Sequence, residues 1–174
     1  MPASPSWDLF IVLFFIIAMA YGIMLQRDKI ITSIISAYAG LVVASSFGDA
    51  VYKFFLGENP VFNSLWIKSN VSLFTVQAVL FVLVMALLVA KSSIGGRSRS
   101  MAPIEMFGYS FLYAGLVLSS ILSFLPADQL ANITNASKFA ARITGWHNWW
   151  IILPILALIF TGWRRRSSSG DEGE

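Results

Sequence analysis

The sequence predicts an all-α protein that crosses a membrane about five times, with its N-terminus outside and its C-terminus in the cytoplasm. Hydrophobic residues make up 57% of the 174 residues and charged residues only 12%, whereas soluble domains carry roughly a quarter charged residues. Five nearly uncharged stretches are each long enough to cross about 30 Å of hydrocarbon as an α-helix. Basic residues flank these stretches unevenly, which predicts the orientation.

The first two predicted spans cover residues 7–25 and 30–47. The first carries one acidic residue, Asp8, at its edge. An Ala-Met-Ala sequence at residues 18–20 resembles a signal-peptide cleavage site, but no basic residue precedes it, so we expect an uncleaved span. Apolar residues continue after the second span, which predicts that its helix extends along the membrane surface.

The third and fourth predicted spans cover residues 71–90 and 106–125. The third contains one amide, Gln77, which is a candidate for a polar contact inside the membrane. The fourth stops at Pro126, because proline is poorly tolerated inside a helix.

The fifth predicted span covers residues 146–163 and carries Pro154 near its middle. Proline removes a backbone hydrogen bond, so we expect a kink there. If this stretch lay on the surface instead, the fold would have four spans plus an interfacial helix. Residues 128–145, just before it, are too polar to cross, but their apolar residues predict a short helix on the outer surface. These apolar residues are Leu130, Ile133, Phe139, Ala140 and Ile143.

Eight of the twelve basic residues fall on one side of this five-span arrangement, and four fall on the other. Because cytoplasmic loops are enriched in Lys and Arg, the side with eight is predicted to be the cytoplasm. We expect one transmembrane domain over residues 1–166 and a disordered cytoplasmic tail over residues 167–174. The four basic residues predicted to lie outside are Lys53, Lys68, Lys138 and Arg142.

The composition also excludes several kinds of functional site. The chain has no cysteine and a single histidine, His147, which excludes disulfides and argues against a metal site. The predicted spans contain no carboxylate at depth of the kind that ion-coupled transporters use. The sequence lacks the common phosphate-binding and hydrolase motifs. We therefore expect no enzyme activity, no cofactor, no metal and no nucleic-acid binding.

Small residues recur at every fourth position of the second span and form one stripe along its helix. Such a stripe lets another helix backbone approach closely, and close packing is the main force between helices in lipid. Internal packing is the favoured interpretation, and an oligomer interface is the alternative. The stripe consists of Ser36, Gly40, Ala44 and Gly48.

Tryptophans mark the ends of the fifth span. Trp146, Trp149 and Trp150 lie at its predicted outer edge, around His147, and Trp163 lies at its other end. Because tryptophan prefers the headgroup level of a bilayer, these four residues are predicted to form an interfacial aromatic belt.

Several positions resemble a known bacterial family. The first span begins with the residues WDLF from Trp7 and carries Gly22 near its end. A charged link at residues 26–29 and a small-residue-rich second span follow, and a Gly-Gly-Arg link begins at Gly95. Over roughly residues 7–125 this pattern is similar to the colicin V production protein family. The resemblance implies a bacterial inner-membrane protein linked to toxin production or export, or to envelope homeostasis.

These observations together predict a non-enzymatic membrane accessory or scaffold protein in the plasma membrane. Its expected partners are the lipid bilayer and either another membrane protein or further copies of itself. The alternative functions are a holin-like or small-solute channel, or a subunit of a larger transporter.

Overall fold

The structure is a computed structural model that describes residues 6–24, 27–55, 71–91 and 103–167. Within these residues the secondary structure is entirely helical. In chain order the helices are α1 (Trp7–Met24), α2 (Arg27–Phe55), α3 (Leu73–Lys91), α4 (Pro103–Ser123), α5 (Ala127–Ala136), α6 (Lys138–Gly145) and α7 (His147–Ser167).

Four of these helices are long and apolar enough to cross a membrane, namely α1, α2, α3 and α4. The pair α6 and α7, bent by 63°, makes a fifth candidate span if it is counted as one unit. The predicted fold class is therefore confirmed as an all-helical protein with four to five candidate spans, which implies a lipid bilayer. The N-out orientation stays a prediction.

The helices begin and end close to the positions expected from hydropathy. Helix α2 runs as one helix from Arg27 to Phe55, so it continues past residue 47 as the apolar residues there led us to expect. At 1.5 Å per residue its length exceeds about 30 Å of hydrocarbon, so part of α2 must tilt or leave the core. The predicted tail beyond residue 167 lies outside the described residues.

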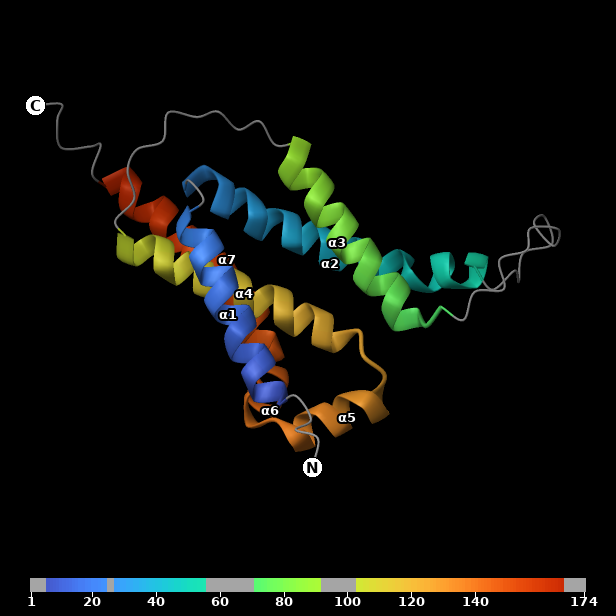
Figure 1. Ribbon diagram of the computed structural model, residues 1–174. Helices are drawn as coiled ribbons and strands as arrows, with labels where there is room; N and C mark the ends of the chain where they lie inside the picture. Colours follow the sequence, from blue (N-terminus) through green and yellow to red (C-terminus); the bar gives the residue numbers. More distant parts are fainter. Residues whose placement is uncertain (1–5, 25–26, 56–70, 92–102, 168–174) are drawn as a thin grey trace, which may run out of the picture.

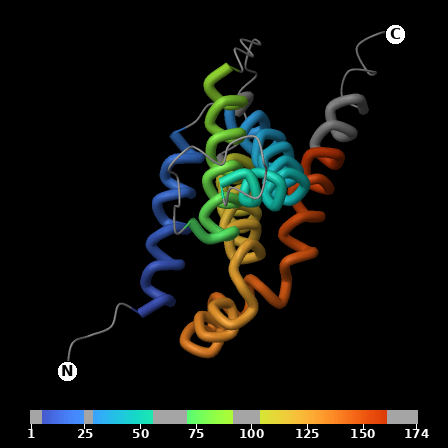
Figure 2. Tube along the Cα trace, turned by 90° about the vertical axis from the view of Figure 1, so that its right-hand side faces the viewer, coloured from blue at the N-terminus to red at the C-terminus, as the bar shows by residue number. Residues whose placement is uncertain are grey.

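In Figure 1, α1 passes in front of α4, and α3 passes in front of α2. Figure 2 shows α1 and α7 on opposite sides of the bundle, with α2, α3 and α4 between them. The central helix is α4, because it packs against α1, α2, α6 and α7. The most extensive contact between two helices is that of α2 with α3.

The main core lies where α2, α3 and α4 meet. Ile30 and Ile34 of α2, Phe81 of α3 and Leu116 of α4 are fully buried there. By contrast, most large apolar side chains of α1 are exposed, as are five of those of α3, namely Val79, Val82, Leu83, Leu87 and Leu88. In water such a surface would be costly, so these two helices are suited to face lipid or another apolar protein surface.

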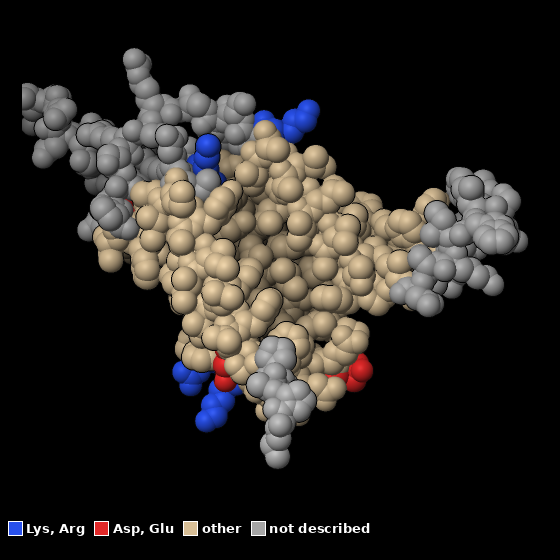
Figure 3. All heavy atoms as spheres, in the orientation of Figure 1, with Lys and Arg blue, Asp and Glu red and all other residues tan. Residues whose placement is uncertain are grey.

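Charged side chains are confined to the ends of the bundle on the face that Figure 3 shows, and the area between them is uncharged. Lys29 lies in the first turn of α2, Lys91 in the last turn of α3 and Asp8 in the first turn of α1. An uncharged band between two charged ends is the pattern that a bilayer demands.

Two short helices, α5 and α6, close one end of the bundle (Figure 1). They occupy the segment where one short surface helix was expected. The chain breaks between them at Ser137, whose hydroxyl caps α6 by accepting a hydrogen bond of 3.0 Å from the Ala140 amide. Ile133, Ala140 and Ile143 are buried against the bundle, whereas Phe139 is 51% exposed.

Candidate functional site

The small-residue stripe of α2 lies against α3. A Cβ atom at Gly40 would stand 2.9 Å from the backbone carbonyl oxygen of Phe81, which is closer than real Cβ atoms approach. A Cβ atom at Gly48 would stand 2.5 Å from Cγ of Gln77. Ser36 and Ala44, the other members of the stripe, are also buried. We call this contact the α2–α3 seam.

The contacts in the α2–α3 seam indicate a packing role for the stripe and for Gln77. At Gly40 and Gly48 the stripe is covered by Phe81 and Gln77 of α3 within the chain. Gln77 covers Gly48, and its amide is half-buried at the edge of the seam. Small residues here allow two helix backbones to approach closely, which strengthens dispersion contacts in lipid.

Hydrogen bonds from α2 and α4 attach α7 to the bundle. The Tyr38 hydroxyl of α2 donates to the Ile151 carbonyl. The Tyr109 hydroxyl of α4 donates to the Ala157 carbonyl at 2.9 Å. In membrane proteins such bonds contribute on the order of 0.6–2 kcal/mol each. We call these two contacts, together with a Ser119–His147 bond described below, the α7 anchor.

Pro154 is fully buried in the middle of α7, and the helix continues through it from His147 to Ser167. A bend of 63° lies at the junction of α6 and α7, next to Trp146, and the kink at Pro154 stays a prediction. Proline has no N–H, so Pro154 leaves the Trp150 carbonyl, four residues before it, without its helical donor. The Tyr38 hydroxyl donates to the neighbouring carbonyl of the same turn, that of Ile151.

Ser119 and His147 form the one contact in the α7 anchor between two side chains. The Ser119 hydroxyl oxygen lies 2.6 Å from Nδ1 of His147. A serine beside a histidine base is the pairing used by many nucleophilic enzymes. Ser119 is only 1% exposed, however, so a substrate has no access to its hydroxyl. The arrangement is therefore suited to joining α4 and α7 and not to catalysis.

The tryptophans around the α6–α7 junction divide into two environments. Trp146 and Trp149 are 59% and 54% exposed at the end of the bundle. Trp150 instead packs inside, where a Cβ atom at Gly115 would stand 2.1 Å from its ring. Trp163 belongs to α7, but its side chain lies outside what the structure describes.

The Trp150 ring lies against two further aromatic rings. Its centroid is 6.2 Å from that of Phe15 in α1 and 5.5 Å from that of Phe111 in α4. The indole nitrogen is buried without a hydrogen-bond partner, as is the hydroxyl of Thr144. Shape and aromatic contacts, and not a hydrogen bond, therefore hold this ring in place.

Asp8 connects the start of α1 to the start of α6. Its carboxylate accepts a hydrogen bond of 2.5 Å from the Ser137 hydroxyl and one of 3.4 Å from the Phe139 amide. A carboxylate is favourable there because the first turn of a helix has free N–H groups and a partial positive charge. The contact places the N-terminal end of α1 on the same side of the bundle as α5 and α6.

Replacing Asp8 with alanine is expected to loosen α6. The change removes the acceptor of the Ser137 and Phe139 bonds, and bonds to a charged group contribute about 1.5–3 kcal/mol. Hydrogen–deuterium exchange of the protein in detergent should become faster in residues 138–145 and stay unchanged in α3. Asp8→Asn is the matched control, because its amide oxygen can still accept both bonds. Equal exchange in Asp8→Ala and the native chain would contradict this role.

Sequence reasoning missed the contacts that attach α7. It did not single out Tyr38, Tyr109 or Ser119, and it did not identify the contact of Trp150 with Gly115. One signal was available, because the fourth predicted span contains several small and hydroxyl residues in an otherwise apolar stretch. Such residues mark the faces along which membrane helices pack. That signal indicates a packed central helix, but it does not identify the partner of each residue.

The chemistry of the described interior is simple. All its buried polar residues are serines, and the described residues contain no buried carboxylate or cation. Among them, no group of three or more His, Asp or Glu side chains could hold a metal ion. Comparison with protein-family models, with curated proteins and with solved structures gives no match to this chain.

Proposed function

We propose that this chain is a non-enzymatic accessory or scaffold protein of a membrane, which acts by holding another membrane protein or further copies of itself in the bilayer. The observation that carries the proposal is the use of the buried hydroxyl groups. Those of Ser110 and Ser120 donate to the preceding turn of α4. Ser119 and Ser137 join one part of the bundle to another.

This use of polar groups leaves the described interior without a reactive or ion-binding group. A transporter coupled to ions needs a carboxylate or comparable group at depth, and a hydrolase needs an accessible nucleophile. What the chain offers a partner is its outer surface. Helix α1 presents large apolar side chains along most of its length, including Leu9, Ile16 and Tyr21. Contacts between such surfaces depend on shape and close packing.

The resemblance of residues 7–125 to the colicin V production family supports a proposal for where the protein acts and in which process. We propose the bacterial inner membrane, and a task in toxin production or export or in envelope homeostasis. The channel and transporter-subunit alternatives remain as distinct outcomes of the test below.

Reconstitution into liposomes separates the scaffold from a channel. Purified protein in vesicles loaded with carboxyfluorescein and potassium is expected to release no more of either than empty vesicles do. Leakage that rises with protein concentration would contradict the scaffold proposal and favour a holin-like channel.

Mass measurements test whether the chain assembles. Extraction into polymer-bounded lipid discs, followed by native mass spectrometry, is expected to give a homo-oligomer or a complex of fixed stoichiometry. A strictly monomeric chain with no reproducible partner would overturn the proposal. A fixed complex with a known transport protein would identify the chain as a transporter subunit.

A further inference from the structure

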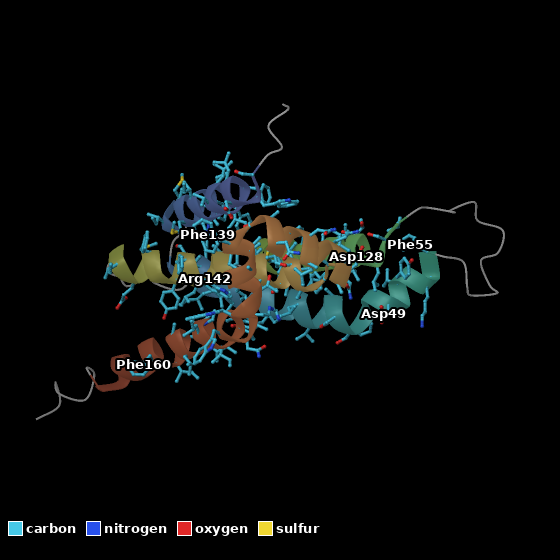
Figure 4. All side chains as sticks on the ribbon, turned by 90° about the horizontal axis from the view of Figure 1, so that it is seen from below. Asp49, Phe55, Asp128, Phe139, Arg142 and Phe160 are labelled. Atoms are coloured by element: carbon cyan, nitrogen blue, oxygen red, sulfur yellow. The ribbon has the colours of Figure 1, made fainter. Side chains whose placement is uncertain are left out.

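The outer face of α6 combines two cations with an aromatic ring. Lys138 and Arg142 are four residues apart, and Phe139 is three residues before Arg142, so the three side chains share one side of the helix. All three are exposed, whereas Ala140 and Ile143 on the other side pack against the bundle. Figure 4, which views the bundle from this end, labels Phe139 and Arg142 on α6.

This face lies at the level where the spans leave the hydrocarbon. Helix α6 contacts α1, α4 and α7. It meets α1 at Asp8 in the first turn, and it joins directly to the start of α7. Trp146 and Trp149 are exposed beside it. Because tryptophan side chains prefer the headgroup region, they place α6 at the headgroup level of the bilayer.

The two cations are available for a ligand. Asp8, the carboxylate nearest to the start of α6, is engaged with Ser137 and the Phe139 amide. No salt bridge joins Lys138 or Arg142 to a carboxylate within the part of the chain that the structure describes. The Asp8 carboxylate thus already balances the partial positive charge at the N-terminus of α6. The charges of Lys138 and Arg142 are on exposed side chains and remain available.

We propose that this face of α6 binds the headgroup phosphate of an anionic phospholipid. Lysine and arginine attract anionic lipids at a membrane surface, and a guanidinium matches the geometry of a phosphate. The neighbouring rings of Phe139, Trp146 and Trp149 suit the boundary between headgroup and acyl chains. A soluble phosphate would use only the cations, so the aromatic neighbours favour a lipid as the occupant.

The site also accounts for a feature of the charge distribution. Lys138 and Arg142 belong to the minority of basic residues on the side predicted to be outside, where the positive-inside trend disfavours them. Two of the four lie one turn apart on a single exposed face. A lipid-binding role explains why positive charge is concentrated there.

Lipid binding resolved by native mass spectrometry tests the proposal. The full chain in detergent is titrated with phosphatidylglycerol or with phosphatidylcholine of the same acyl chains. Each basic residue at an anionic surface strengthens binding by roughly fivefold. The Lys138→Gln/Arg142→Gln variant is therefore expected to bind phosphatidylglycerol on the order of twentyfold more weakly. Its weak binding of phosphatidylcholine should not change.

Two control variants make the result specific. Lys53→Gln/Lys91→Gln removes the same charge from two other exposed positions and should keep phosphatidylglycerol binding. Lys138→Arg/Arg142→Lys keeps both positive charges and should also keep phosphatidylglycerol binding. Equal losses in both glutamine variants would overturn the proposal, as would a native chain that does not prefer phosphatidylglycerol. Competition by millimolar glycerol 3-phosphate as effective as that by the lipid would also overturn it, in favour of a soluble phosphate.

Discussion

Replacing Gly40 with leucine is expected to separate α2 from α3 and to cause one of the largest losses of stability in this chain. A Cβ atom at this position would already stand 2.9 Å from the Phe81 carbonyl oxygen and 3.2 Å from its ring. A backbone carbonyl cannot rotate away as a side chain can, so the whole of α3 must shift. Added volume in a packed interior costs typically 1–3 kcal/mol, and we expect about 3 kcal/mol here.

The free energy of unfolding in mixed micelles, measured by titration with a denaturing detergent, checks this prediction. Gly40→Ala should fall between the native chain and Gly40→Leu. Ala50→Leu is the matched control, because Ala50 lies on the same helix and is exposed. If Gly40→Leu were as stable as Ala50→Leu, the α2–α3 seam would not have the close contact described above.

Replacing Gly115 with leucine is expected to expel the Trp150 ring and loosen α7. Three ring atoms would lie between 2.1 and 2.8 Å from a Cβ atom at Gly115. Because Phe15 and Phe111 flank the ring, it cannot move without losing both aromatic contacts. Loss of a buried tryptophan side chain costs roughly 3–5 kcal/mol, which sets the upper limit of the effect.

A double-mutant cycle isolates the contact between Gly115 and Trp150. Trp150→Ala should destabilise the native chain but cost much less in the Gly115→Leu background, because the leucine occupies part of the vacated space. Gly108→Leu is the control on the same helix, since a Cβ atom at Gly108 meets nothing within 4 Å. Additive losses in the cycle, or a Gly108→Leu variant as unstable as Gly115→Leu, would contradict the structure.

The sequence alone was sufficient to predict the fold class and the approximate ends of the spans. The free energies of transferring successive side chains into lipid add up along the chain. A run of about 20 apolar residues therefore identifies a span without knowledge of the neighbouring helices. In the segment of α5 and α6, the helical spacing of the apolar residues was also informative. Ile133, Ala140 and Ile143 were expected on its apolar side and are buried, whereas Phe139 was expected there and is 51% exposed.

The rotation of each span about its own axis was decided only by the tertiary structure. Helices α1 and α3 are apolar on all sides, so no periodic pattern indicates which side packs. The stripe of α2 could meet α3 or a second copy, and only the packed bundle shows it against Phe81 and Gln77. The Trp150 ring packs at Gly115 and beside the rings of Phe15 and Phe111, which its position in the sequence does not indicate.

For the polar contacts, too, the sequence shows one part and only the tertiary structure shows the rest. A sequence shows that Tyr38, Tyr109 and Ser119 need hydrogen-bond partners in lipid, because unpaired polar groups are costly there. It does not show which carbonyl or ring nitrogen each will meet, since that depends on how neighbouring spans are rotated and displaced. Composition therefore identifies this chain as a membrane protein, whereas close packing in three dimensions determines which of its residues hold the bundle together.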